Sequence, residues 1–167
     1  KLSRTYVSTY GVTHYGVHIV GHTSTGVWLQ RRSQEIAFPG LLDTMAAGGL
    51  PYPETPQEGA TKELEEECGI KADKTSPLTP TGALRMFYHS KDTRLVNHHT
   101  YTFDINCEGI TPQVIEPHEV AGYEHISYDK LLPMIAEGRE LKPNANIVML
   151  DFAIRHGHLA PDHPEYL

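Results

Sequence analysis

Three glutamates near the middle of the chain, Glu63, Glu66 and Glu67, have a spacing that allows metal chemistry. On a helix, residues at i, i+3 and i+4 project from one face, so these carboxylates would lie together and repel one another. Mg²⁺ relieves such repulsion, because it takes carboxylate oxygens and completes its shell with water and substrate phosphates. Taken alone, three glutamates more often mark a solvated acidic face, so the neighbouring residues decide between the two interpretations.

The neighbouring residues form a longer pattern with fixed spacing. Gly48 is followed after five residues by Glu54, and after seven more by the segment KELEEECGI at 62–70. This pattern resembles the Nudix box, Gly-x5-Glu-x7-Arg-Glu-U-x-Glu-Glu-x-Gly-U, where U is aliphatic. Every fixed position matches except one, where Lys62 replaces the usual arginine. The resemblance implies a hydrolase that cleaves a diphosphate linkage.

The resemblance also implies the metal ligands. The three glutamates would bind Mg²⁺ or Mn²⁺ near the substrate diphosphate, joined by a backbone carbonyl from Ala47 or Gly48. Bound metal in such a site polarises phosphoryl oxygens and supplies an activated water for in-line attack.

Two further roles follow from the box and its surroundings. Glu54 and Lys62 are expected to pair and to brace the loop against the helix, with lysine a looser brace because it lacks the bidentate fork of arginine. A surface pairing of Lys62 within its own helix is the alternative. Glu63 is the first choice for the general base, and Glu119, in the later loop 116–119, is the other candidate.

The residues that select the substrate are expected before the box. Arg31 and Arg32 alternate faces on a strand, so only one can point into the cleft, and we favour Arg32 for a phosphate contact. Trp28 shares the face of Arg32 and is either a stacking platform or part of the core. Phe38 is a weaker stacking candidate.

This region also narrows the resemblance. The segments WLQRRS at 28–33 and FPGLLD at 38–43 are similar to the Nudix branch associated with thiamin pyrophosphokinase. That similarity implies thiamin diphosphate, or an oxidised or damaged analogue, as substrate and a monophosphate as product. The alternatives are ADP-ribose or a nucleotide sugar as substrate, or a Nudix-fold module that binds a ligand without cleaving it.

One helix must position the glutamates, and its boundaries are well marked. Thr55 is a candidate N-cap, Pro56 occupies the first helical position, Glu58 follows the cap by three residues, and Gly69 suits a left-handed stop, which predicts a helix over 56–68. The remaining elements are predicted from hydrophobic periodicity and turn residues, with strands at 15–21, 26–32, 82–89, 98–107 and 120–127 and helices at 128–137 and 144–156. This order predicts a single α/β (α+β) domain over 1–167, with a mixed sheet sandwiched between helices, which the resemblance identifies as the Nudix fold.

Composition limits the partners. The net charge of −7 argues against a nucleic-acid binder, and no apolar run approaches a membrane span. A small-molecule diphosphate is therefore the expected partner, with divalent cations between it and the acidic protein. Two cysteines suit a reducing compartment, which favours the cytoplasm, and a homodimer is possible. Because the chain opens on Lys1, we expect a form trimmed from a longer chain with an N-terminal region.

Overall fold

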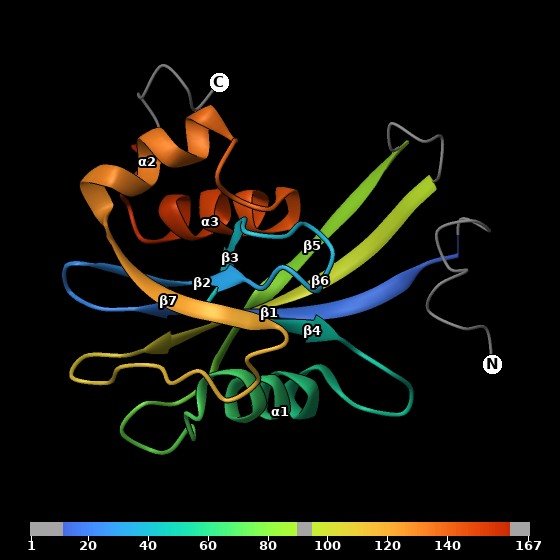
Figure 1. Ribbon diagram of the computed structural model, residues 1–167, viewed down its shortest axis with the longest axis horizontal. Coiled ribbons are helices and arrows are strands. Elements are labelled where there is room, and N and C mark those ends of the chain that lie inside the picture. Colours follow the sequence, from blue (N-terminus) through green and yellow to red (C-terminus); the bar gives the residue numbers. More distant parts are fainter. Residues whose placement is uncertain (1–11, 90–94, 161–167) are drawn as a thin grey trace.

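The computed structural model describes residues 12–89 and 95–160 (Figure 1). Within these ranges the chain forms a mixed sheet and three helices. The strands are β1 (His14–His22), β2 (Gly26–Arg32), β3 (Leu42–Thr44), β4 (Ala46–Gly49), β5 (Thr79–His89), β6 (Leu95–Asn106) and β7 (Val120–Ser127). The helices are α1 (Pro56–Cys68), α2 (Tyr128–Glu137) and α3 (Pro143–Arg155).

The sheet is mixed because one of its strand pairings is parallel. Its main path runs β3-β2-β1-β6-β5, with β4 paired to β1 and β7 paired to β2. β1 and β6 run parallel, whereas the other pairs are antiparallel. Helix α1 lies on one side of the sheet, and α2 and α3 lie on the other (Figure 1). The predicted architecture, a mixed sheet between helices, is confirmed.

Two hydrophobic cores fill the space between the sheet and its helices. Alternation along β1 divides its side chains between them, because successive residues of a strand face opposite sides. Val17 and Ile19 pack with Leu64 of α1, whereas Val20 packs with Phe152 of α3. The polar residue between the first two, His18, therefore faces away from the α1 core, toward the side of the sheet that α2 and α3 cover.

Helix α1 begins and ends where its cap residues predict. Thr55 accepts a hydrogen bond from the backbone of Glu58, the Glu58 carboxylate accepts one from the backbone of Thr55, and Gly69 ends the helix with φ 67°. This reciprocal cap satisfies two of the amide groups that a helix leaves open at its first turn. The helix is therefore fixed in length and register, which determines the face that its glutamates present.

The short strands β3 and β4 were not predicted. In the sequence, residues 42–47 show only a short apolar segment before the two glycines, because strands of three and four residues are too short for a period-2 pattern. β4 pairs with β1 from Gly16 to Ile19 and so carries Ala47 and Gly48 to the centre of the sheet. None of the helices in the described ranges has the length and apolar composition needed to cross a membrane.

Candidate active site

A cleft of about 730 Å³ lies between α1, the loop 116–119 and the start of α3. Its lining has two kinds of charged residue. Acidic residues of α1 and of the 116–119 loop are joined by basic residues from β2 and from the residue before α3. Four metal-ligand candidates (Glu63, Glu66, Ala47 and Gly48) and both base candidates (Glu63 and Glu119) line this cleft, whereas Glu67 is buried and is not part of its lining.

The predicted glutamate face of α1 forms the acidic wall. Glu63 is half-buried, Glu66 is exposed and Glu67 is buried, while Glu65 projects to solvent. Gly48 makes room for this wall, because a Cβ built on it would lie only 1.9 Å from Oε1 of Glu63. The glycine of the motif thus leaves the Glu63 carboxylate the space beside strand β4 that a Cβ would take.

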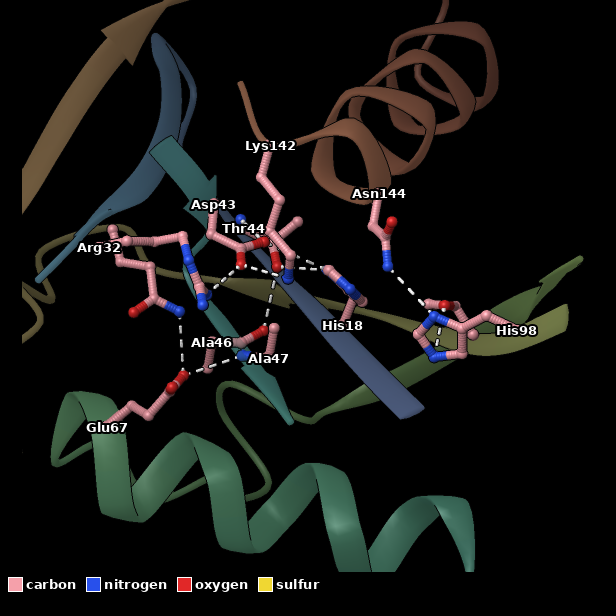
Figure 2. A network of polar contacts seen from close by, with 12 residues as sticks. His18, Arg32, Asp43, Thr44, Ala46, Ala47, Glu67, His98, Lys142 and Asn144 are labelled. Atoms are coloured by element: carbon pink, nitrogen blue, oxygen red, sulfur yellow. Dashed lines mark hydrogen bonds and ion pairs between the residues drawn. The ribbon is translucent and has the colours of Figure 1, made fainter. Parts of the chain in front are cut away.

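Glu67 is the most constrained of the three glutamates. One of its oxygens, Oε2, accepts hydrogen bonds from the backbone N–H of Ala47 at 2.8 Å and from Nε2 of Gln30 at 3.1 Å (Figure 2). Burial raises the pKa of Glu67 to about 8, and the carboxylates of Glu63, Asp43 and Glu119 act in the same direction, against the Ala47 hydrogen bond. A buried carboxyl among other carboxylates is stable in its ionised form only beside positive charge. This donor set of carboxylates beside a strand backbone fits a hard divalent cation.

The expected brace between Glu54 and Lys62 does not form. Lys62 instead lies 3.8 Å from Glu66, one helical turn away, and both side chains are about half exposed. Among the described residues, Lys62 and Glu54 form no ion pair. The carboxylate of Glu54 instead lies beside the first turns of α1, where its Oε2 atom would be 3.9 Å from a Cβ built on Gly59. The pairing within the helix prevails because an i,i+4 neighbour is within reach of the flexible lysine without any loop contact.

The loop carrying Glu119 is fixed to the end of β2. The Ser33 hydroxyl donates a hydrogen bond to the carbonyl of His118, and the Ser33 amide donates to the carbonyl of Glu119 at 2.9 Å. Ligand atoms of Glu116, His118 and Glu119 lie within 4.8 Å of one another. Glu119 and Glu63 thus enter the same cleft from different elements, so both candidates for the general base are in position.

The basic wall is organised by one buried carboxylate. Asp43, with no solvent exposure, accepts from Nη1 of Arg32 at 2.9 Å and from Nζ of Lys142 at 2.7 Å (Figure 2). The Thr44 amide also donates to it, at 2.9 Å. Burial opposes ionisation of Asp43, but Lys142 and Arg32 outweigh that effect and hold its pKa below the usual value.

His18 completes the floor of the cleft as a neutral side chain. Its Nδ1 lies 2.8 Å from the Thr44 hydroxyl, which itself donates to the Ala46 carbonyl at 3.1 Å. Because a hydroxyl has one proton to give, the Nδ1 atom of His18 must be the donor in this chain. Burial lowers the pKa of His18 to about 4, although Asp43 acts in the opposite direction.

The predicted substrate residues divide between the cleft and its outside. Arg32 and Phe38 line the cleft. The backbone of Phe38 has a φ of 58°, which residues other than glycine rarely adopt. Arg31 faces away and pairs with Glu124 at 2.6 Å. Trp28 does not line the cleft: it packs beside the α1 core, with its ring edge-on to His125 at 5.0 Å. The core alternative therefore applies to Trp28.

Four residues described above were missed from the sequence: His18, Gln30, Asp43 and Lys142. Gln30 had a detectable signal, since it lies two residues before Arg32 on the same strand face. Asp43 is a charged residue within an otherwise uncharged run, Leu41 to Gly49, which is itself unusual in a buried segment. Lys142 had no signal, because its role depends on a contact with a residue 99 positions earlier.

Comparisons with known proteins agree with this fold, which is that of a NUDIX domain. The NUDIX domain family model matches residues 12–146. An uncharacterized protein of Saccharomyces cerevisiae, YJR142W, is 30% identical over 99% of this chain and 54% of its own length. Nudix hydrolase 20, chloroplastic, of Arabidopsis thaliana is 28% identical over 100% of this chain and 46% of its own.

Among solved structures, DR0079 from Deinococcus radiodurans has the same fold, with a TM-score of 0.68 and 22% identity over 83% of this chain and 82% of that one. The chain belongs to the NUDIX domain family. It spans about half the length of the two curated relatives described above.

Proposed function

We propose that this domain hydrolyses the diphosphate linkage of a small organic molecule with Mg²⁺ or Mn²⁺. The observation that supports this most is the pairing of two oppositely charged walls in one cleft. The acidic wall suits divalent cations, and the basic wall suits a phosphate that those cations do not neutralise. A diphosphate has an anionic group for each.

The residues have separate roles in this proposal. Glu63 and Glu66, which line the cleft, would hold the metal together with the buried Glu67 and a backbone carbonyl of Ala47 or Gly48. The bound metal supplies Lewis-acid polarisation of the phosphoryl oxygens and lowers the pKa of water.

The remaining chemistry belongs to the side chains of the domain. Either Glu63 or Glu119 accepts the proton of the attacking water, since both enter the cleft. Arg32 holds a phosphate oxygen by a charge-assisted hydrogen bond.

For the substrate we propose thiamin diphosphate or an oxidised analogue, giving the monophosphate. ADP-ribose or a nucleotide sugar is the second candidate. The organic group would lie against aromatic rings of the cleft lining, which include Phe38, Tyr88, His14 and His98. The rings of His14 and His98 stack at 4.1 Å. Trp28 has no part in this proposal. The cytoplasm stays a prediction, and the Arabidopsis relative is named as chloroplastic.

The test is turnover by the purified protein with Mg²⁺. A panel of thiamin diphosphate, its oxo form, ADP-ribose and a nucleotide sugar is incubated, and release of phosphate or a monophosphate is measured. We expect hydrolysis by the wild type and loss of at least about 100-fold in Glu67→Gln, as for removal of a group that stabilises developing charge. No release from any compound, with both proteins alike, would refute the hydrolase assignment. Faster cleavage of ADP-ribose than of every thiamin compound would favour the second candidate.

A further inference from the structure

The basic wall holds two cations against one buried anion. Arg32 and Lys142 both contact the same oxygen, Oδ2 of Asp43, at 2.9 and 2.7 Å. Their side chains are only 13% and 15% exposed, so solvent screens their mutual repulsion weakly. With His18 neutral, the group carries one excess positive charge.

The main chain holds both cations in place before any ligand arrives. The Lys142 amide donates to the Leu42 carbonyl at 2.8 Å, and the Leu42 amide donates to the Glu140 carbonyl at 2.8 Å, so the residues before α3 lie along β3. The Nε atom of Arg32 donates to the carbonyl of Ala37 at 2.8 Å. Neither cation depends on a flexible surface partner.

Both cations keep donors that the protein does not use. In the described part of the chain, the ammonium of Lys142 has Asp43 as its one hydrogen-bond acceptor, and Nη2 of Arg32 has none. Both residues line the cleft that also contains Glu63 and Glu66. Unused donors on closely spaced, poorly solvated cations favour a polyvalent anion with several oxygens.

We propose that Arg32 and Lys142, held as a pair by Asp43, form an anion subsite that binds the substrate phosphate lying away from the glutamate wall. Lys142 is a direct ligand in this subsite, and Asp43 is a positioning residue that acts through the two cations. The inference deepens the proposed function, on which it rests for the identity of the anion as a phosphate. It gives the diphosphate a fixed direction in the cleft, with one phosphate at each wall.

The kinetic test compares Lys142→Met with a matched control, Lys130→Met, whose lysine is exposed on α2 outside the cleft. We expect Lys142→Met to raise KM about tenfold or more, as for loss of a charge-assisted hydrogen bond, with a smaller change in kcat. The Mg²⁺ concentration for half-maximal activity should stay the same, because Lys142 lies away from the glutamates. Lys142→Arg should restore KM to within about threefold of the wild type, since it retains the charge.

Asp43→Asn tests the positioning role. It retains the shape of the side chain but removes the charge that holds the two cations. We expect a similar rise in KM that does not add to that of Lys142→Met in the double variant, because both changes act on the same ammonium. If Asp43→Asn does not fold, the lysine variants still decide the question. Additive effects on KM in a folded double variant would refute the positioning role.

A binding test separates this inference from the proposed function. Titration of inorganic phosphate into metal-free protein, followed by calorimetry, should show binding to the wild type and to Lys130→Met, and binding about tenfold weaker to Lys142→Met. Equal binding to wild type and Lys142→Met, or none to the wild type, would refute the subsite. If the wild type binds phosphate and Lys142→Met does not, but the wild type cleaves no diphosphate, the proposed function would be refuted and the subsite would be retained.

Discussion

Replacing the buried glutamate of α1 with glutamine, Glu67→Gln, should make the metal-free protein more stable while it removes activity. Glu67 is 3% exposed, and its Oε2 accepts from Ala47 and Gln30. The side-chain oxygen of glutamine can accept both hydrogen bonds, so the change removes a charge and little else. The carboxylate is therefore present for function at the expense of stability in the metal-free protein.

The magnitude follows from the pKa of Glu67, which is about 8 in the folded protein and 4.5 as an ordinary glutamate. Because the folded pKa is raised, the folded state retains a proton that the unfolded state releases, so stability falls as pH rises from 4.5 to 8. This linkage costs the wild type about 1 kcal/mol at pH 5 and about 4 kcal/mol at pH 8. Glutamine carries no such cost, so the variant should gain these amounts.

Urea unfolding in EDTA at pH 5 and pH 8 measures the difference. We expect the free energy of unfolding of Glu67→Gln to exceed that of the wild type at both pH values, with a difference several-fold larger at pH 8 than at pH 5. Mg²⁺ should stabilise the wild type far more than the variant. Glu65→Gln, an exposed glutamate of the same helix, is the control and should change little at either pH. A variant that is no more stable than the wild type at pH 8, or a gain independent of pH, would show that the carboxyl is not strained by burial.

Three further changes test separate parts of the structure. Gly48→Ala should lower kcat/KM at least about tenfold, because its Cβ would displace the Glu63 carboxylate, while Gly122→Ala, whose Cβ meets nothing within 4 Å, should match the wild type in the same assay. The wild type should lose about 2 kcal/mol of stability between pH 7.5 and 5, because the unfolded histidine takes up a proton below pH 6.5 and the folded one does so only near pH 4. His18→Gln should not show this loss. Equal dependence of stability on pH for the two proteins, measured by urea unfolding, would refute this explanation. Leu64→Ala should destabilise the fold by about 2–5 kcal/mol in urea, because Leu64 is fully buried under the sheet, and a smaller loss would mean that the α1 core relaxes around the cavity.

Elements with strong local signals could be predicted from the sequence. Helices α1 and α2 begin and end at the predicted residues, because α1 has a cap residue at each end and α2 directly follows a clearly marked strand. The ends of β5 and β6 were less accurate: β5 begins at Thr79 and β6 at Leu95, each three residues before the prediction. Strand ends depend on which neighbour pairs with them, and β6 begins and ends through its register with β1 and β5. That register is a tertiary property.

The two walls of the cleft differ in the same way. The glutamate wall could be predicted because its members lie within five residues on one helix, where spacing alone fixes their direction. The basic wall depends on a contact between β3 and the residue before α3. The uncharged run around Asp43 marks that residue as unusual but does not indicate its partner, and nothing local to Lys142 does so either. The brace between Glu54 and Lys62 was predicted incorrectly because a motif gives residue types, whereas the pairing depends on which acidic neighbour is nearer.

The two walls also share a physical property that explains why they occur in one cleft. Each brings like charges together in a poorly solvated place, carboxylates at the face of α1 and cations around Asp43. The glutamate wall does not stabilise the ligand-free fold, whereas Asp43 offsets the repulsion between its two cations and is itself held ionised by them. Asp43 also holds Arg32 and Lys142 on their own side of the cleft. The cleft thus has opposite charges on its two sides, and on the proposed function a ligand with cations at one end and bare phosphate oxygens at the other would relieve both repulsions.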